Sequence, residues 1–92
     1  MMLEIVTPEA VIFKSEVESV TVPGINGSFQ MLKDHAPIVS LLVAGEVKIK
    51  GDNIELIKAH KALFKADKGE YLLNIQGGTI EMNHNKIIVL AD

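Results

Sequence analysis

Short apolar segments separated by turn residues run along most of the chain. Residues 3–7 and 16–22 are rich in Val, Ile, Leu and Thr, and these segments are followed by Pro8 and Pro23-Gly24. Apolar and charged side chains alternate strictly over residues 46–50. β-branched residues between proline and glycine breaks are typical of β-strands. The pattern therefore predicts an all-β protein.

Later segments predict a buried strand and a hairpin. Residues 38–44 are almost wholly apolar, which favours a strand buried on both faces. Residues 79–82 and 87–90 are two extended segments that we expect to pair across the turn 83–86. Gly77-Gly78 just before them predicts a bulge or a tight bend.

The segment 52–68 has two interpretations. Lysines recur in it at helical spacing, and Asp52 and Glu55 suit the first turn of a helix. Alternatively, residues 62–64 and 71–73 are the strands of a hairpin that turns at Asp67-Lys68-Gly69. The sequence pattern leaves both alternatives open.

These elements predict a two-sheet β-sandwich. About ten short strands fit into the 92 residues, with one short helix or extra hairpin within 52–68, and no repeat or linker interrupts them. A second domain has no room, so residues 1–92 are expected to form a single domain. The core is modest, because a chain of this size buries only about 60–65% of its unfolded surface.

Charge and hydropathy exclude two kinds of partner. The formal net charge is −3, and all the basic residues are scattered lysines, which provide no stripe for a nucleic-acid backbone. The N-terminus lacks the basic region of a signal peptide. The longest apolar run is far shorter than the roughly 20 residues of a membrane helix. We therefore expect neither nucleic-acid binding nor direct membrane insertion.

Candidate catalytic groups are sparse. Asp34-His35 with Ser28 or Ser40 is conceivable as a small hydrolase, but no Gly-x-Ser-x-Gly elbow accompanies these residues. The three histidines lie far apart, each without a second ligand at metal-binding spacing, and the chain has no cysteine. The turn at 24–27 lacks the Gly-Lys-Ser/Thr of a phosphate-binding loop. No catalytic residue, metal, cofactor or nucleotide is therefore expected, and the residues favour an interaction module.

A set of motifs covering residues 3–50 and 71–92 is more specific. Val-x-Gly-x-x-Gly-x-Phe occupies residues 22–29 and is followed by His-Ala-Pro at 35–37, while Gly-Gly-Thr-Ile-Glu-Met begins at Gly77. In this order the motifs resemble the N-terminal β-sandwich domain of the epsilon subunit of bacterial F-type ATP synthases.

The resemblance implies a function without catalysis. Such a subunit belongs to the central stalk of a proton-translocating ATP synthase, peripheral to the cytoplasmic face of the bacterial plasma membrane, and couples ring rotation to ATP synthesis. Its partners are the gamma subunit and the subunits of the membrane ring (c). Carried onto this chain, the gamma-facing positions are Thr7, His35 and Ser40. The ring-facing position is Ser28, with Met31 beside it.

The chain departs from the family pattern in three places. Gln30 and Lys33 replace residues that are often glycine and proline in the loop before the His-Ala-Pro motif. The segment from about Gly51 to Leu63 is an insertion relative to shorter members. The two-helix C-terminal hairpin of many relatives has no counterpart, so no inhibition through it is expected. The alternatives to the epsilon subunit are the small hydrolase and an unrelated β-sandwich adapter.

Overall fold

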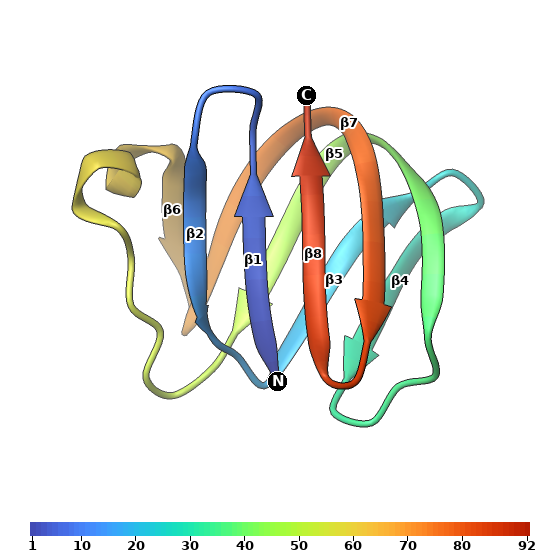
Figure 1. Cartoon of the computed structure of the whole chain (residues 1–92). Helices are drawn as coiled ribbons and strands as arrows, with labels where there is room; N and C mark the ends of the chain where they lie inside the picture. The colour runs from blue at the N-terminus through green and yellow to red at the C-terminus, as the bar shows by residue number, and fades with distance from the viewer.

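A computed structural model describes all 92 residues, which form a strongly curled β-sheet (Figure 1). The elements are β1 (Met2–Val6), β2 (Val11–Glu16), β3 (Ser19–Gly24), β4 (Gly27–Leu32), β5 (Ile38–Lys50), the 3-10 helix η1 (Lys58–Leu63), β6 (Phe64–Asp67), β7 (Glu70–Asn83) and β8 (Lys86–Ala91). The strands follow the order β2-β1-β8-β7-β5-β3-β4, and β6 pairs with β7 outside this path.

Strands β5 and β7 connect the two layers of the fold. They contain 13 and 14 residues and pair with each other from Ile38↔Met82 to Lys50↔Glu70. The first residues of β7, Glu70 to Leu73, also pair with β6, and its last residues, Gly78 to Asn83, pair with β8. Each long strand thus contributes to both layers, and the sheet folds over itself as a sandwich (Figure 1). With β5 and β7 counted once in each layer, the eight strands give ten strand segments. The all-β sandwich predicted from the sequence is confirmed.

Three hairpins, β3–β4, β6–β7 and β7–β8, close with two-residue turns. In the β7–β8 turn, His84 and Asn85 have φ of 50° and 59° between the paired residues Asn83 and Lys86. Positive φ at both central positions is the geometry that matches the twist of antiparallel strands. The predicted hairpin over 79–90 is therefore confirmed.

The sequence predicts a bulge or a tight bend at Gly77-Gly78, but β7 continues through both glycines in unbroken register with β5. Their φ values of 153° and 149° are rare for other residues. A Cβ atom on Gly78 would overlap the carbonyl oxygen of Leu90. The glycine is needed because β8 lies so close to β7 at the point where β7 passes between the layers.

The segment 52–68 follows the hairpin interpretation. Strand β6 pairs with β7 from Phe64↔Leu73 to Asp67↔Glu70, and Lys68 and Gly69 form the turn with φ of 49° and 81°. The helix predicted across the whole segment is wrong, and only η1 is helical. An extended β6 allows Phe64 to pack against the core while its lysine stays exposed.

The interior is one cluster of 18 buried apolar residues. Val47 and Ile49 belong to it, as their alternation with charged residues predicts. The prediction that residues 38–44 are buried on both faces is wrong, since Val39 is 75% exposed and Leu41 is 56% exposed. A strand in a two-layer sandwich has only one inward face, and nothing in the chain covers the outer face of β5.

The segment before η1 closes one side of the sandwich. Leu56 forms an isolated bridge to Phe13, and the Glu55 N–H donates to the Ser15 hydroxyl at 3.1 Å. The rings of Phe13 and Phe64 are 5.5 Å apart between centroids. The insertion therefore covers the core between β2 and β6.

Candidate interaction surface

A row of side chains, apolar except for Thr79, crosses the outside of the sheet. Cross-strand pairing places its members on neighbouring strands, since directly paired residues point to the same face. The pairs are Leu41↔Thr79, Thr79↔Leu90, Leu90↔Val6 and Val6↔Val11, and the Ile25 N–H donates to the Leu41 carbonyl. We call this row, together with the adjoining turn residue Ile25, the outer stripe; the row comprises Leu41, Thr79, Leu90, Val6 and Val11.

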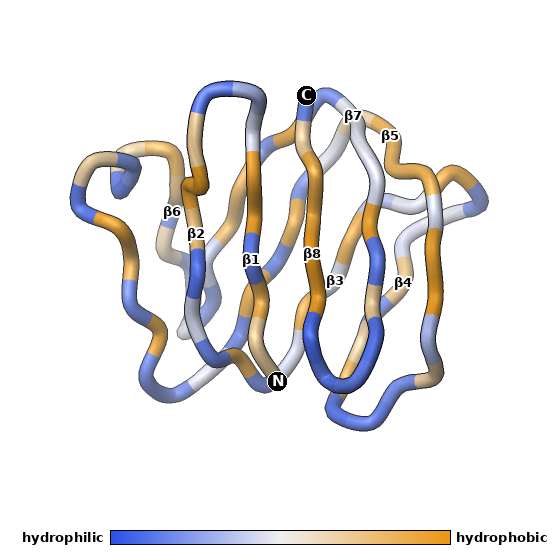
Figure 2. Tube along the Cα trace, viewed as in Figure 1, coloured by the Kyte–Doolittle hydropathy of each residue, from blue (hydrophilic) through white to orange (hydrophobic).

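The outer stripe is accessible along much of its length. Ile25, Leu41 and Leu90 are 56%, 56% and 52% exposed. Val39 and Val43, on either side of Leu41 along β5, widen it. Figure 2 shows the hydrophobic character along β8. At about 4.8 Å per strand, five strands extend over roughly 20 Å. Contiguous apolar surface of this kind marks protein–protein contact sites.

One end of this face is the loop that contains His35. His35 is exposed, and its Nδ1 lies 2.8 Å from the Ala36 carbonyl oxygen. The backbone N–H of His35 donates to the Leu32 carbonyl oxygen. The preceding Asp34 is hydrogen-bonded to Asn85 of the β7–β8 turn. The two hydrophilic loops therefore lie side by side at the lower edge of the sandwich (Figure 2).

Thr7 lies at the other end of the same face. It follows Val6 in the turn between β1 and β2, where its hydroxyl donates to the Ala10 carbonyl oxygen and accepts from the Ala10 N–H, each at 3.3 Å. Strand β8 runs from beside the His35 loop to beside Thr7 (Figure 1). Thr7 and His35 therefore do not meet; they lie beyond the two ends of β8.

The remaining predicted contact residues have different exposures. Ser40 is half-buried, and its hydroxyl donates to the Leu41 carbonyl oxygen at 3.3 Å. Ser28 is exposed on β4. Met31 has no exposed surface, so the expectation that it faces a partner is wrong. Strand alternation directs Met31 into the core, whereas Ser28 points outward.

The candidate hydrolase residues are not assembled. Asp34 bonds Asn85, His35 contacts the carbonyl of its own neighbour, and no hydrogen bond joins His35 to Ser28 or Ser40. Nucleophile and base must lie within hydrogen-bond reach for such catalysis. No group of three or more potential metal-ligating side chains forms a cluster. No helix has the length and apolar character needed to span a membrane.

Sequence reasoning missed most of the outer stripe. Val6, Val11 and Leu90 come from separate segments; the antiparallel pairing of β1 with β2 brings Val11 beside Val6, and the parallel pairing of β1 with β8 adds Leu90. Non-local strand order was not predictable from the alternation within each strand. A signal was present in 38–44, where apolar residues occupy both faces of a strand in a protein too small to bury both.

The chain matches the family model described as ATP synthase, Delta/Epsilon chain, beta-sandwich domain over residues 1–92. It is 37% identical over 90 residues to the ATP synthase epsilon chain of Chlorobaculum tepidum, covering 98% of this chain and 86% of that one. It is 41% identical over 88 residues to that of Campylobacter jejuni, covering 96% and 57%, so it spans little more than half of this longer relative.

Solved structures share the fold. A chain in the Euglena gracilis mitochondrial ATP synthase matches with a TM-score of 0.77 and 17% identity, over 99% of this chain and 49% of that one. A chain in the central stalk and c-ring structure from Tetrahymena thermophila matches with a TM-score of 0.71 and 16% identity, over 99% and 62%.

Proposed function

The chain belongs to the family of ATP synthase delta and epsilon chains, because it matches their β-sandwich domain, and from this membership we propose that it binds the gamma subunit through the outer stripe. It is a non-catalytic rotor subunit of the ATP synthase. Residues 1–92 act as one rigid domain in this role, because a single core joins both layers of the sandwich.

The outer stripe is the observation that carries the proposal. A rotor subunit has to hold its partner firmly enough to transmit torque, and burial of apolar side chains provides most of such binding energy. Thr7 and His35 lie beyond opposite ends of this face and supply polar contacts at its margins. Half-buried Ser40 supports the strand that presents Val39 and Leu41.

The second partner is the membrane ring. Ser28 is exposed beside the β3–β4 turn and is the residue we assign to this contact. Family membership places the chain in a membrane-associated complex. We propose the cytoplasmic face of the bacterial plasma membrane as its location.

Co-purification with the gamma subunit tests the proposal. Leu41→Lys introduces a charge into the outer stripe, whereas Leu32→Lys does the same at a leucine with nearly equal exposure, 54% against 56%, on β4. Losing one buried leucine forfeits about 1.5–3 kcal/mol, so Leu41→Lys should weaken the complex at least tenfold. Leu32→Lys should bind gamma as the unmodified chain does. Equal binding by both variants, or no binding by the unmodified chain, contradicts the proposal.

A further inference from the structure

A second row of residues lies beside the outer stripe on the same face of the sheet. This row crosses β5, β7, β8, β1 and β2 through the pairs Val39↔Glu81, Glu81↔Ile88, Ile88↔Glu4 and Glu4↔Lys14. Two carboxylates therefore occupy one row, but their cross-strand neighbours differ. Glu4 is directly opposite Lys14, whereas Glu81 lies between Val39 and Ile88.

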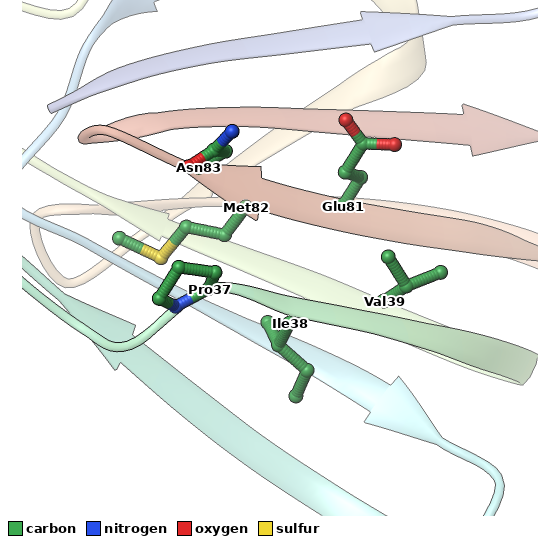
Figure 3. A pocket seen from close by; sticks show the side chains of 6 residues that line it. All are labelled: Pro37, Ile38, Val39, Glu81, Met82 and Asn83. Atoms are coloured by element: carbon green, nitrogen blue, oxygen red, sulfur yellow. The ribbon is translucent and has the colours of Figure 1, made fainter.

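Glu81 makes no ion pair within the chain. The one ion pair of the protein joins the Met1 ammonium group to Glu16 at 3.1 Å. Figure 3 shows Glu81 and Val39 projecting from neighbouring strands. A shallow hollow of about 280 Å³ adjoins them, lined by Pro37, Ile38, Val39, Glu81, Met82 and Asn83. The carboxylate is the only ionisable group in this lining.

Covering this face changes the surroundings of Glu81. In the free chain its carboxylate is exposed and hydrated. A partner on the outer stripe would remove much of that water, and an ionised carboxylate without a compensating partner is strongly unfavourable away from water. Directly opposite Glu81 the chain offers only Val39 and Ile88, and Lys86, which lies diagonally across on β8, makes no ion pair with it, so a cation of the partner would supply the compensating charge.

We propose that Glu81 receives a lysine or arginine side chain of the gamma subunit, an inference that rests on the proposed function. The aliphatic stem of such a side chain packs on Val39 and Pro37, and its charged end meets the carboxylate. Glu81 thus selects the register in which gamma docks, because an apolar or acidic side chain at this place leaves the carboxylate uncompensated.

The test uses the intact chain and purified gamma subunit in a binding titration at several salt concentrations. Glu81→Gln removes the charge and keeps the shape, and Glu4→Gln is the matched control on the same row. We expect Glu81→Gln to weaken binding about tenfold or more at low salt and to reduce its salt dependence, with Glu4→Gln within about twofold. Thermal unfolding should be unchanged for Glu81→Gln, because the side chain is exposed.

Each outcome separates the inference from the proposed function. If gamma binds the unmodified chain and Leu41→Lys weakens it, but Glu81→Gln binds with unchanged affinity and salt dependence, the basic partner is refuted and the apolar interface stands. Equal weakening by Glu81→Gln and Glu4→Gln also refutes it, since the effect then reflects general charge. If the unmodified chain does not bind gamma, both the interface and the role of Glu81 fail.

Discussion

Asp34 and Asn85 are joined by two reciprocal hydrogen bonds although 51 residues separate them. The Asp34 N–H donates to the Asn85 Oδ1 at 2.6 Å, and the Asn85 Nδ2 donates to the Asp34 Oδ1 at 2.9 Å. Both residues have positive φ, 65° and 59°. The pair therefore fixes the start of the His35 loop to the β7–β8 turn, at the edge of the proposed gamma interface.

Removing this pair should loosen the His35 loop without unfolding the sandwich. Asn85→Gly deletes both bonds and keeps a residue that tolerates positive φ. At an exposed site each bond contributes only about 0.5–1 kcal/mol, so stability should fall by at most about 2 kcal/mol. Hydrogen exchange of the Asp34 amide should accelerate about tenfold, and gamma binding should weaken. His84→Gly, in the same turn, is the control that should leave that amide protected. Unchanged exchange in Asn85→Gly contradicts the positioning role.

The inserted segment should contribute to stability through Leu56. This side chain packs on the core and bridges Phe13, whereas Leu63 in the same segment is 52% exposed. Leu56→Ala should lower the free energy of unfolding by about 1–3 kcal/mol, because it removes partly buried apolar surface. Leu63→Ala should change it by less than about 0.5 kcal/mol. Thermal and denaturant unfolding measure both. Equal, negligible effects would mean that the segment is a surface excursion after all.

Gly78 should be intolerant of any side chain. A Cβ atom there overlaps the Leu90 carbonyl, and φ is 149°. Gly78→Ala should therefore force β7 and β8 apart and destabilise the protein by about 3 kcal/mol or more. Gly69→Ala is the control, because its φ of 81° is also unfavourable but nothing lies within 4 Å of an added Cβ. It should lose only about 1–2 kcal/mol. Similar unfolding midpoints for the two variants contradict the close approach.

Local features were predictable where neighbouring residues determine them. The β7–β8 hairpin follows from extended segments on either side of a polar turn, and the buried side of β5 around Val47 follows from alternation. The prediction of a helix over 52–68 is wrong because the spacing of the lysines indicates only which side chains are exposed. It carries no information on Phe64, which reaches Phe13 from an extended strand.

The candidate surface was harder to predict than the fold. Motif resemblance predicts Thr7 and His35 as contact residues, and local hydrogen bonds place each of them in a loop. It could not show that Val6 and Leu90 share a face, because that depends on parallel pairing between the first and last strands. For the same reason Glu81 is not distinctive in the sequence; it becomes so only beside Val39 and Ile88.

Met31 and Ser28 lie on the same strand and should separate core packing from ring contact. Met31 has no exposed surface, so Met31→Ala should destabilise the protein by about 2–5 kcal/mol through the cavity it leaves. Because Ser28 is exposed, Ser28→Tyr should leave the unfolding temperature nearly unchanged. It should hinder association of the gamma-bound chain with the solubilised membrane ring, because the bulky tyrosine side chain would occupy the contact. Unfolding curves and ring pull-downs measure both effects. A Met31→Ala protein that keeps full stability yet loses the ring would place Met31 in the interface, and a Ser28→Tyr protein that still binds the ring would remove Ser28 from it.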